Sequence, residues 1–192
     1  MQGQLWIVAA PSGGGKTSLI AEAVRVLDDV VESVSHTTRA ARPGEIEGVH
    51  YFFVAPGEFQ AMIDADGFLE YAQVFHNAYG TAAASVDALL AAGKDVILSI
   101  DWQGAQQVMA RRPDTRTVFL LPPSLDALRE RLTARGQDNP AVVEKRMAEA
   151  EEQISHFSAF EFVIVNEVFA QAAGELQALI TTDRLRRTRR EA

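Results

Sequence analysis

The sequence predicts an α/β protein built on a central, mainly parallel sheet flanked by helices. Helical and extended patterns alternate along most of its 192 residues, as they do in chains of βαβ units. Two short apolar runs, 95–100 and 117–121, are typical of strands buried on both faces of a sheet. A third apolar run, Leu5–Ala10, breaks into a glycine-rich loop and then opens a helix. This strand–loop–helix order also belongs to that fold class.

The expected elements follow one another along the chain. Ser124 suits the cap of one helix, and Pro140 suits the first turn of another. Residues 35–86 interrupt the alternation of strands and helices and predict an inserted subdomain. Hydrophobic periodicity predicts strands over 31–35, 50–54, 68–75, 95–100, 117–121 and 162–165, and helices over 17–26, 56–65, 81–90, 103–111, 124–134, 140–157 and from about 170 onward.

The glycine loop is the most informative segment. It reads Pro-Ser-Gly-Gly-Gly and leads into Lys16 and Thr17. Such a loop turns backbone N–H groups toward an anion, and the following helix adds the positive end of its dipole. Lys16 can reach the β- and γ-phosphates of a nucleotide, and the Thr17 hydroxyl can bind Mg²⁺. Ala10 stands where the strict pattern has glycine, and alanine is tolerated there if its φ is negative. The alternative is a flexible turn with an incidental lysine.

Composition and charge exclude several classes of protein. The net charge of −8 argues against general binding of nucleic acid. No apolar run is long enough to span a bilayer, so a membrane is not an expected partner. The absence of cysteine excludes disulfides and thiolate metal sites, and we expect a cytoplasmic location.

A second polar cluster lies in the interrupting segment. Arg39 and Arg42, nearby hydroxyl groups and Tyr51 could form a pocket for another phosphate, although a solvated polar loop would look the same. Glu70 lies within an aromatic and apolar extended segment, which is an unfavourable place for a carboxylate without donors. A purine base with two N–H donors would satisfy it. Strand alternation could instead turn Glu70 toward solvent.

Four arginines lie on two adjacent helical segments near the break at Gly136. A mobile flap that carries arginines onto a transferring phosphoryl group would exclude water and spread negative charge. The alternative is ion pairing with glutamates along the helix surface, and we assign Arg129 to this alternative. These residues are Arg129, Arg131, Arg135 and Arg146.

Together these segments resemble the guanylate kinase family of bacterial type. The resemblance covers nearly the whole chain, and its second motif, which begins at Ser35, is highly specific. It is carried by Ala9–Lys16, Ser35–Glu45, Gly48–Phe53, Phe68–Glu70, Tyr79–Thr81, Ile100–Gly104, the Arg-Gly-Gln-Asp run at 135–138 and Val163–Asn166.

The resemblance implies the fold of a P-loop nucleoside monophosphate kinase in three parts. A core would comprise residues 1–34, 87–124 and 158–192. A GMP-binding subdomain would comprise 35–86, and a helical lid 125–157. The implied activity is transfer of the γ-phosphoryl group of Mg-ATP to GMP, giving GDP and ADP. The implied partners are therefore the small molecules GMP and ATP.

The resemblance also implies a role for individual residues. Thr17 would contact Mg²⁺, and the catalytic residues would be Lys16, Arg39, Arg131, Arg135 and Arg146. ATP would be bound by Ala10, Pro11, Ser12, Gly13, Gly14, Gly15, Lys16, Thr17, Ser18 and Asn166. GMP would be bound by Ser35, Arg39, Arg42, Glu45, Tyr51, Glu70, Tyr79, Thr81 and Asp101.

Three positions depart from the usual pattern of that family. Ser99 stands where an acidic residue is usual, which affects a water-mediated or Mg²⁺-linked contact. His76 and Ala78 stand where glycine and tyrosine are usual, although Tyr79 itself is kept.

Two other interpretations stay open. One is a kinase of the same fold that acts on another phosphorylated acceptor, such as a ribose bisphosphate. The other is a guanylate-kinase-like module that binds peptides and performs no chemistry. The intact run 13–17 argues against the module, because such modules lack a working phosphate loop.

Overall fold

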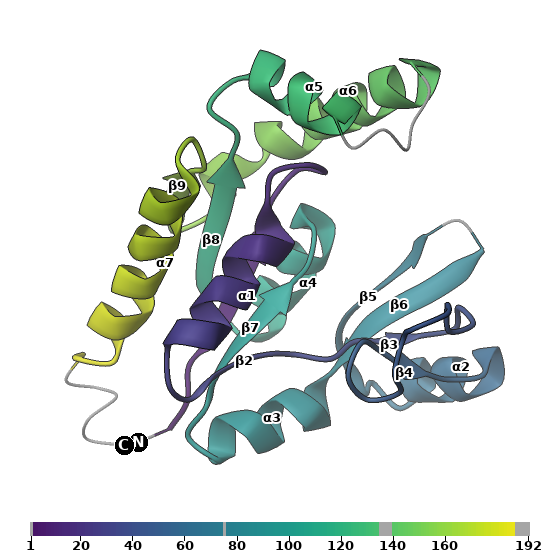
Figure 1. Ribbon diagram of the computed structural model, residues 1–192. Coiled ribbons are helices and arrows are strands. Elements are labelled where there is room, and N and C mark those ends of the chain that lie inside the picture. The colour runs from purple at the N-terminus through teal and green to yellow at the C-terminus, as the bar shows by residue number, and fades with distance from the viewer. Residues whose placement is uncertain (1, 75, 135–139, 187–192) are drawn as a thin grey trace.

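The computed structural model describes residues 2–74, 76–134 and 140–186 (Figure 1). Its central sheet has five strands in the order β2-β7-β1-β8-β9, and each neighbouring pair is parallel. The strand order changes direction around β1, so the loop after β1 lies at the point where α/β sheets bind ligands. The predicted α/β class is confirmed. The strands are β1 (Leu5–Ala9), β2 (Val30–Glu32), β7 (Asp95–Ser99), β8 (Arg116–Leu121) and β9 (Phe162–Val165).

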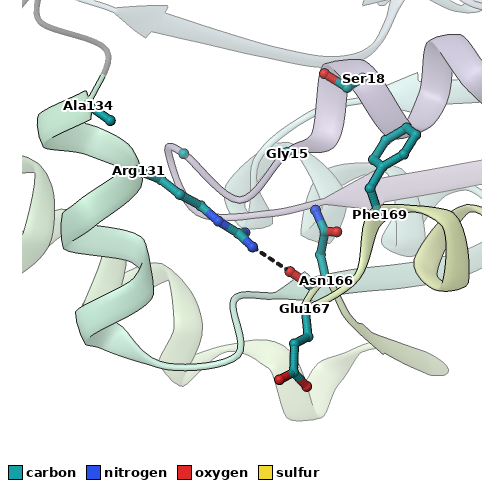
Figure 2. Close-up of a pocket in the computed structure, with 8 residues that line it drawn as sticks. Gly15, Ser18, Arg131, Ala134, Asn166, Glu167 and Phe169 are labelled. Atoms are coloured by element: carbon teal, nitrogen blue, oxygen red, sulfur yellow. Dashed lines mark hydrogen bonds between the residues drawn. The ribbon is translucent and has the colours of Figure 1, made fainter.

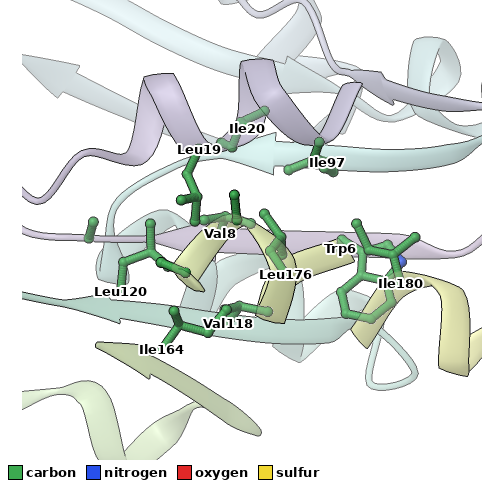
Figure 3. Close-up of a cluster of buried hydrophobic side chains, with 14 of the residues drawn as sticks. Trp6, Val8, Leu19, Ile20, Ile97, Val118, Leu120, Ile164, Leu176 and Ile180 are labelled. Carbon is green, nitrogen blue, oxygen red and sulfur yellow. The ribbon is translucent and has the colours of Figure 1, made fainter. Parts of the chain in front are cut away.

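Helices cover both faces of this sheet. On one face, Trp6 and Val8 pack with Leu19 of α1 and Leu176 of α7 (Figure 3). On the other face, Ile7 packs with side chains of α3 and α4. Side chains alternate along a strand, which explains why successive β1 residues enter different cores. The helices are α1 (Lys16–Val26), α3 (Ala83–Ala91), α4 (Trp102–Arg111) and α7 (Phe169–Asp183).

A second, four-stranded sheet is inserted between β2 and α3. Its order is β4-β3-β6-β5, and the β5–β6 pair is an antiparallel hairpin. The ring of Phe59 in α2 stacks on Phe68 with centroids 4.5 Å apart, which closes a small separate core. The elements are β3 (His36–Thr37), β4 (Phe52–Phe53), α2 (Pro56–Asp64), β5 (Phe68–Val74) and β6 (Asn77–Ala82).

Two helices after β8, α5 (Leu125–Ala134) and α6 (Pro140–Ser155), pack together around their own apolar cluster, which includes Leu128 and Met147. The backbone N–H of Ala127 donates to the Ser124 hydroxyl at 3.1 Å, so the predicted cap is confirmed. A short 3₁₀ helix, η1 (Phe157–Ala159), leads into β9.

The structure corrects the predicted elements in two places. Residues 77–82 form strand β6, and the helix expected over 81–90 begins at Ala83. The strand expected over 31–35 ends at Glu32, and His36–Thr37 belongs to the second sheet instead. Pairing with distant strands, which local patterns do not reveal, decides both boundaries. Within the described ranges, no helix is long and apolar enough to cross a membrane.

Candidate nucleotide site

The loop between β1 and α1 has the backbone geometry of an anion cradle. Gly13 and Gly15 have φ values of 85° and 90°, which L-residues with side chains rarely adopt. A Cβ on Gly15 would lie 2.4 Å from the amide nitrogen of Asn166, so glycine is required there by contact as well. The non-glycine residues with positive φ in the described ranges are Asp29 and Asp66. Ala10 therefore adopts an ordinary conformation, as its substitution for glycine requires.

Lys16 crosses the carboxyl edge of the central sheet. Its ammonium donates to the carbonyl of Ile100, just beyond β7, at 3.0 Å. Burial lowers the pKa of Lys16, and the negative charges of Asp101, Glu32 and Glu70 oppose that shift. The loop encloses a cavity of about 200 Å³ lined by residues 10–18. Lys16 therefore lies between this cavity and three carboxylates, ready to accept a phosphate as a new partner.

A larger cavity of about 450 Å³ adjoins the loop on the side of α5 and α7 (Figure 2). Arg131 of α5 points into it and donates to the carbonyl of Asn166 at 2.8 Å. The Asn166 amide in turn donates to the carbonyl of Gly14 at 2.9 Å. This chain of contacts ties helix α5 and the end of β9 to the phosphate loop. Phe169 supplies an apolar wall at the mouth of the cavity.

A third cavity, of about 350 Å³, lies between the phosphate loop and the second sheet. Thr17 contributes from the loop side and Glu32 and Ser99 from the ends of β2 and β7. Ser35 and Tyr51 contribute from the residues that immediately precede β3 and β4. The lining is rich in hydroxyl and carboxylate groups. Because it joins the two parts of the molecule, an acceptor bound against the second sheet would face the phosphate loop.

Arg39 is held at the edge of this cavity by Glu45. Its guanidinium donates to both carboxylate oxygens, at 2.8 and 2.9 Å. These bonds and the backbone N–H of Arg42 lower the pKa of Glu45 to about 2. The Cζ of Arg39 lies 5.3 Å from the centroid of the Tyr51 ring, and Tyr51 and Tyr79 make an edge contact at 6.0 Å. The structure thus brings Arg39, Glu45 and both tyrosines together, while the Arg42 side chain is exposed.

Glu70 is only 7% exposed, which rules out the alternative that it faces solvent. The Thr81 hydroxyl donates to its Oε1 at 2.6 Å. Burial raises the pKa of Glu70, the Thr81 hydroxyl opposes the shift, and the charge of Asp101 adds to it. A Cβ on Gly104 would lie 3.0 Å from Oε2, so the glycine lets α4 approach the carboxylate. Asp101 caps α4 by accepting from the Gly104 N–H at 2.9 Å.

Comparison with known proteins identifies the family to which this arrangement belongs. The family model described as guanylate kinase matches residues 2–183. The chain belongs to the guanylate kinase family. The guanylate kinase of Alkalilimnicola ehrlichii is 52% identical over 191 residues, which cover 100% of this chain and 94% of the relative. That of Legionella pneumophila is 49% identical and covers 96% of this chain and 88% of the relative.

Two solved structures are similar to this chain, and one of them is a guanylate kinase. A crystal structure of guanylate kinase from Anaplasma phagocytophilum superposes with a TM-score of 0.76 at 31% identity, covering 98% of this chain and 89% of that one. The SH3-kinase fragment of tight junction protein 3 superposes with a TM-score of 0.52 at 14% identity, covering 96% of this chain and 59% of that one. The second similarity shows a shared fold alone.

The arginines on the α5–α6 pair do not share one environment. Arg129 forms an ion pair with Glu144, as the helix-surface alternative predicts. Arg131, two residues later, turns instead into the cavity beside the phosphate loop. Arg146 is partly exposed on α6, and Arg135 lies outside the described residues. A Cβ on Gly13 would lie 3.0 Å from Leu128 and from Leu132, so α5 packs directly against the loop.

The residues present suit Mg²⁺ carried by a nucleotide. Groups of three or more His, Cys, Asp or Glu side chains that could hold a metal are absent from the described residues. A protein that binds Mg²⁺ mainly through substrate phosphates and water does not need such a group. Thr17 is exposed and lines the cavity between the loop and the second sheet, and its hydroxyl is a hard oxygen ligand of the kind that this ion prefers.

Two residues of the site are absent from the sequence-based prediction. Gly104 allows the close approach to Glu70, and Glu32 lies at the end of β2 beside the phosphate loop. The rule that ligands bind at the carboxyl ends of parallel strands could have found Glu32. The sequence-based prediction missed Glu32 because the expected strand continued to residue 35 and placed Glu32 within it.

Proposed function

We propose that this member of the guanylate kinase family transfers the γ-phosphoryl group of ATP, carried with Mg²⁺, to GMP. An oxygen of the GMP phosphate attacks the γ-phosphorus, the bond to the bridging oxygen of ADP breaks, and GDP and ADP leave. The attacking oxygen is already anionic near pH 7, so the site needs no general base. Its tasks are to position two polyanions and to balance their charge.

The donor half of the proposed site is the phosphate loop with its neighbouring cavity. Backbone N–H groups of residues 10–18 would bind the triphosphate together with Lys16. The Thr17 hydroxyl would bind Mg²⁺, which supplies positive charge to the β- and γ-phosphates when bound. The cavity that Phe169 walls is large enough for the adenosine part, and Asn166 would contact its base side.

The acceptor half is the second sheet and the loop that carries Arg39. Arg39, Arg42, Tyr51 and Tyr79 would bind the GMP phosphate, with Glu45 holding Arg39 in place. The ion pair between Arg39 and Glu45 supports this role, because a fixed guanidinium presents a fork that matches phosphate oxygens. Guanine would be bound by Ser35, Glu70, Thr81 and Asp101.

Arginines of the α5–α6 pair would complete the site over the transferring group. Arg131 already reaches the cavity beside the phosphate loop, which supports its role in stabilising transition-state charge. Arg146 of α6, and Arg135, which lies outside the described residues, would act with it. We assign residues 125–157 as a lid, 35–86 as the GMP-binding part, and 1–34, 87–124 and 158–192 as the core. We include the cytoplasm in the proposal because the chain is free of cysteine.

The buried Glu70 carboxylate is the single observation that carries this proposal. A carboxylate of raised pKa with one protein hydroxyl on Oε1 retains acceptor capacity that a ligand must satisfy. Guanine offers both N1–H and the N2 amino group on one edge, which matches two carboxylate oxygens. Adenine presents an acceptor at N1 and would be repelled.

A panel of acceptors tests the proposal. The purified chain is incubated with Mg-ATP and GMP, AMP, CMP or UMP, and each diphosphate product is quantified by chromatography. We expect GDP as the main product, with kcat/KM for GMP about 10⁴-fold above that for AMP. Comparable use of AMP would contradict the role of Glu70. Activity with a phosphorylated sugar in place of all four nucleotides would favour the other kinase interpretation.

A further inference from the structure

The cavity between the phosphate loop and the second sheet contains a carboxylate that the roles above leave unused. Two glutamates line this cavity, Glu32 and Glu45. Glu45 is occupied on both oxygens by Arg39 and also accepts from the backbone N–H of Arg42 at 2.7 Å. Among the described residues Glu32 forms no such ion pair, although the Ser99 hydroxyl acts on its carboxylate, and Glu32 is exposed at the mouth of the cavity. It is therefore the lining carboxylate that is available to a ligand.

Strand geometry directs Glu32 toward the phosphate loop. In the parallel pair of β2 and β7, Glu32 lies beside Ile97, whose side chain faces helix α1. Ser99 follows Ile97 by two residues and shares that face of the sheet. Helix α1 begins on the same face with Lys16 and Thr17. The end of β2 thus presents a carboxylate to the residues at the amino end of α1.

The electrostatics agree with this placement. Burial raises the pKa of Glu32, while the Ser99 hydroxyl and then the positive charge of Lys16 oppose that shift. Glu32 in turn raises the pKa of Lys16. Ser99 itself carries no charge, and the nearby Asp101 is engaged with the Gly104 N–H. The carboxylate at this position therefore comes from β2 and not from the end of β7.

We propose that the Glu32 carboxylate, together with the Thr17 hydroxyl, holds the Mg²⁺ ion of the bound Mg-nucleotide, directly or through its water shell. Mg²⁺ in nucleotide sites is typically bound by one or two carboxylates together with phosphates and waters. Among the cavity lining, the hydroxyls of Thr17 and Ser99 and the Glu32 carboxylate provide that set of hard oxygen atoms. This inference rests on the proposed function, because the ion arrives with the nucleotide.

The alternative role for Glu32 is to balance the charge of Lys16 without contact with the metal. The two roles differ in how Mg²⁺ and the nucleotide affect each other's affinity. A metal contact makes part of the nucleotide affinity depend on Mg²⁺. A charge partner of Lys16 affects nucleotide affinity equally with and without the ion. This difference is a coupling between two ligands, which binding measurements determine without catalysis.

Calorimetric titration with the β,γ-imido analogue of ATP, in Mg²⁺ and in EDTA, tests the proposal. For the unaltered chain, Mg²⁺ should tighten binding. In E32Q we expect this tightening to be about tenfold weaker, the size typical of lost outer-shell metal partners, with the Kd in EDTA unchanged or lower. In the double variant E32Q/S99D, a carboxylate returns from the neighbouring strand and should restore most of the tightening. E175Q removes the same charge from an exposed position on α7 and should behave as the unaltered chain.

The outcomes separate failure of the metal contact from failure of the proposed function. Equal changes in Kd with and without Mg²⁺ in E32Q would overturn the metal contact and assign Glu32 to Lys16. An unchanged Mg²⁺ effect in E32Q would overturn it as well. If the unaltered chain binds the analogue in neither buffer, the proposed function fails, and this inference fails with it. Circular dichroism of each variant shows whether the fold is kept.

Discussion

The phosphate loop after β1 and the second sheet lie on opposite sides of the cavity of about 350 Å³ between them, but they are shaped by different means. The loop is shaped by backbone: two glycines with positive φ, a helix start and one lysine. The second sheet and its loops are shaped by side-chain pairs: Arg39 with Glu45 after β3, and Glu70 of β5 with Thr81 of β6. A backbone cradle binds phosphates of any nucleotide, whereas paired side chains can distinguish one base from another. We therefore expect changes in the loop to stop the reaction and changes in the second sheet to alter the choice of acceptor.

Removing the Lys16 ammonium should have the largest effect. In K16A we expect kcat to fall by at least about 10³-fold, because the positive charge that stabilises the transferring phosphoryl group is lost. A coupled assay of ADP formation measures this fall. The control is K94A, which removes a partly exposed lysine that pairs with Asp29 and precedes the amino end of β7. Retained turnover in K16A would mean that the loop does not take part in the chemistry.

Replacing Arg131 should have the second largest effect on turnover. We expect R131A to lower kcat by about 10²-fold or more while KM for GMP changes little, because the charge acts in the transition state. Steady-state kinetics with both substrates separate the two constants. R129A is the matched control on the same helix, because Arg129 pairs with Glu144 on the surface. A rise in KM alone would assign Arg131 to ground-state binding of the substrate.

Replacing Glu45 should weaken the binding of GMP and leave the binding of ATP unchanged. In E45Q the Arg39 guanidinium loses a charged partner, and we expect KM for GMP to rise about tenfold while KM for ATP stays constant. The pKa of Glu45 is lowered to about 2, so the ion pair contributes above the ordinary carboxyl pKa and is lost as pH falls toward 2. This ion pair should therefore stay intact between pH 6 and pH 8, and its loss should cause no change in the KM of the unaltered chain for GMP over that range. Equal changes for both substrates would contradict a separate acceptor half.

The smallest effect that we predict concerns stability. The pKa of Glu70 is raised by burial, so its ionisation costs stability as pH rises through the interval between its ordinary and its raised value. E70Q removes that cost. We expect its Tm at pH 8 to exceed that of the unaltered chain by about 2 °C or more, with the difference vanishing near pH 4. Thermal unfolding followed by circular dichroism at both pH values checks this, and a lower Tm at pH 8 would contradict it.

The two halves also differ in how far the sequence predicts them. The phosphate loop is a contiguous run whose strand, glycines, lysine and helix each have a local signal, and the structure has them in that order. The acceptor half depends on pairing between distant segments. Strand β6 carries Thr81 to Glu70, yet its Asn-Ala-Tyr-Gly-Thr-Ala run has little β signal and forms a strand through pairing with β3 and β5.

Glu32 shows the same limit at a single residue. A three-residue difference in the end of β2 decides whether this carboxylate lies within a strand or at the edge where ligands bind. The environment of Glu70 is likewise a property of the fold. The apolar residues beside Glu70 in the sequence predict that a charge there is unfavourable. Thr81 and Gly104, however, lie next to Glu70 only because β6 and α4 pack against β5.

The acceptor preference of E70Q tests the account most directly. The ratio of kcat/KM for GMP to that for AMP is measured for the unaltered chain and for E70Q, along with the Kd for Mg-ADP. If side chains of the second sheet read the base while the loop binds the donor, the ratio falls at least about 100-fold and the Kd for Mg-ADP stays constant. A ratio that does not change in E70Q, or a Kd for Mg-ADP that rises as much as the ratio falls, would contradict this division between the two halves.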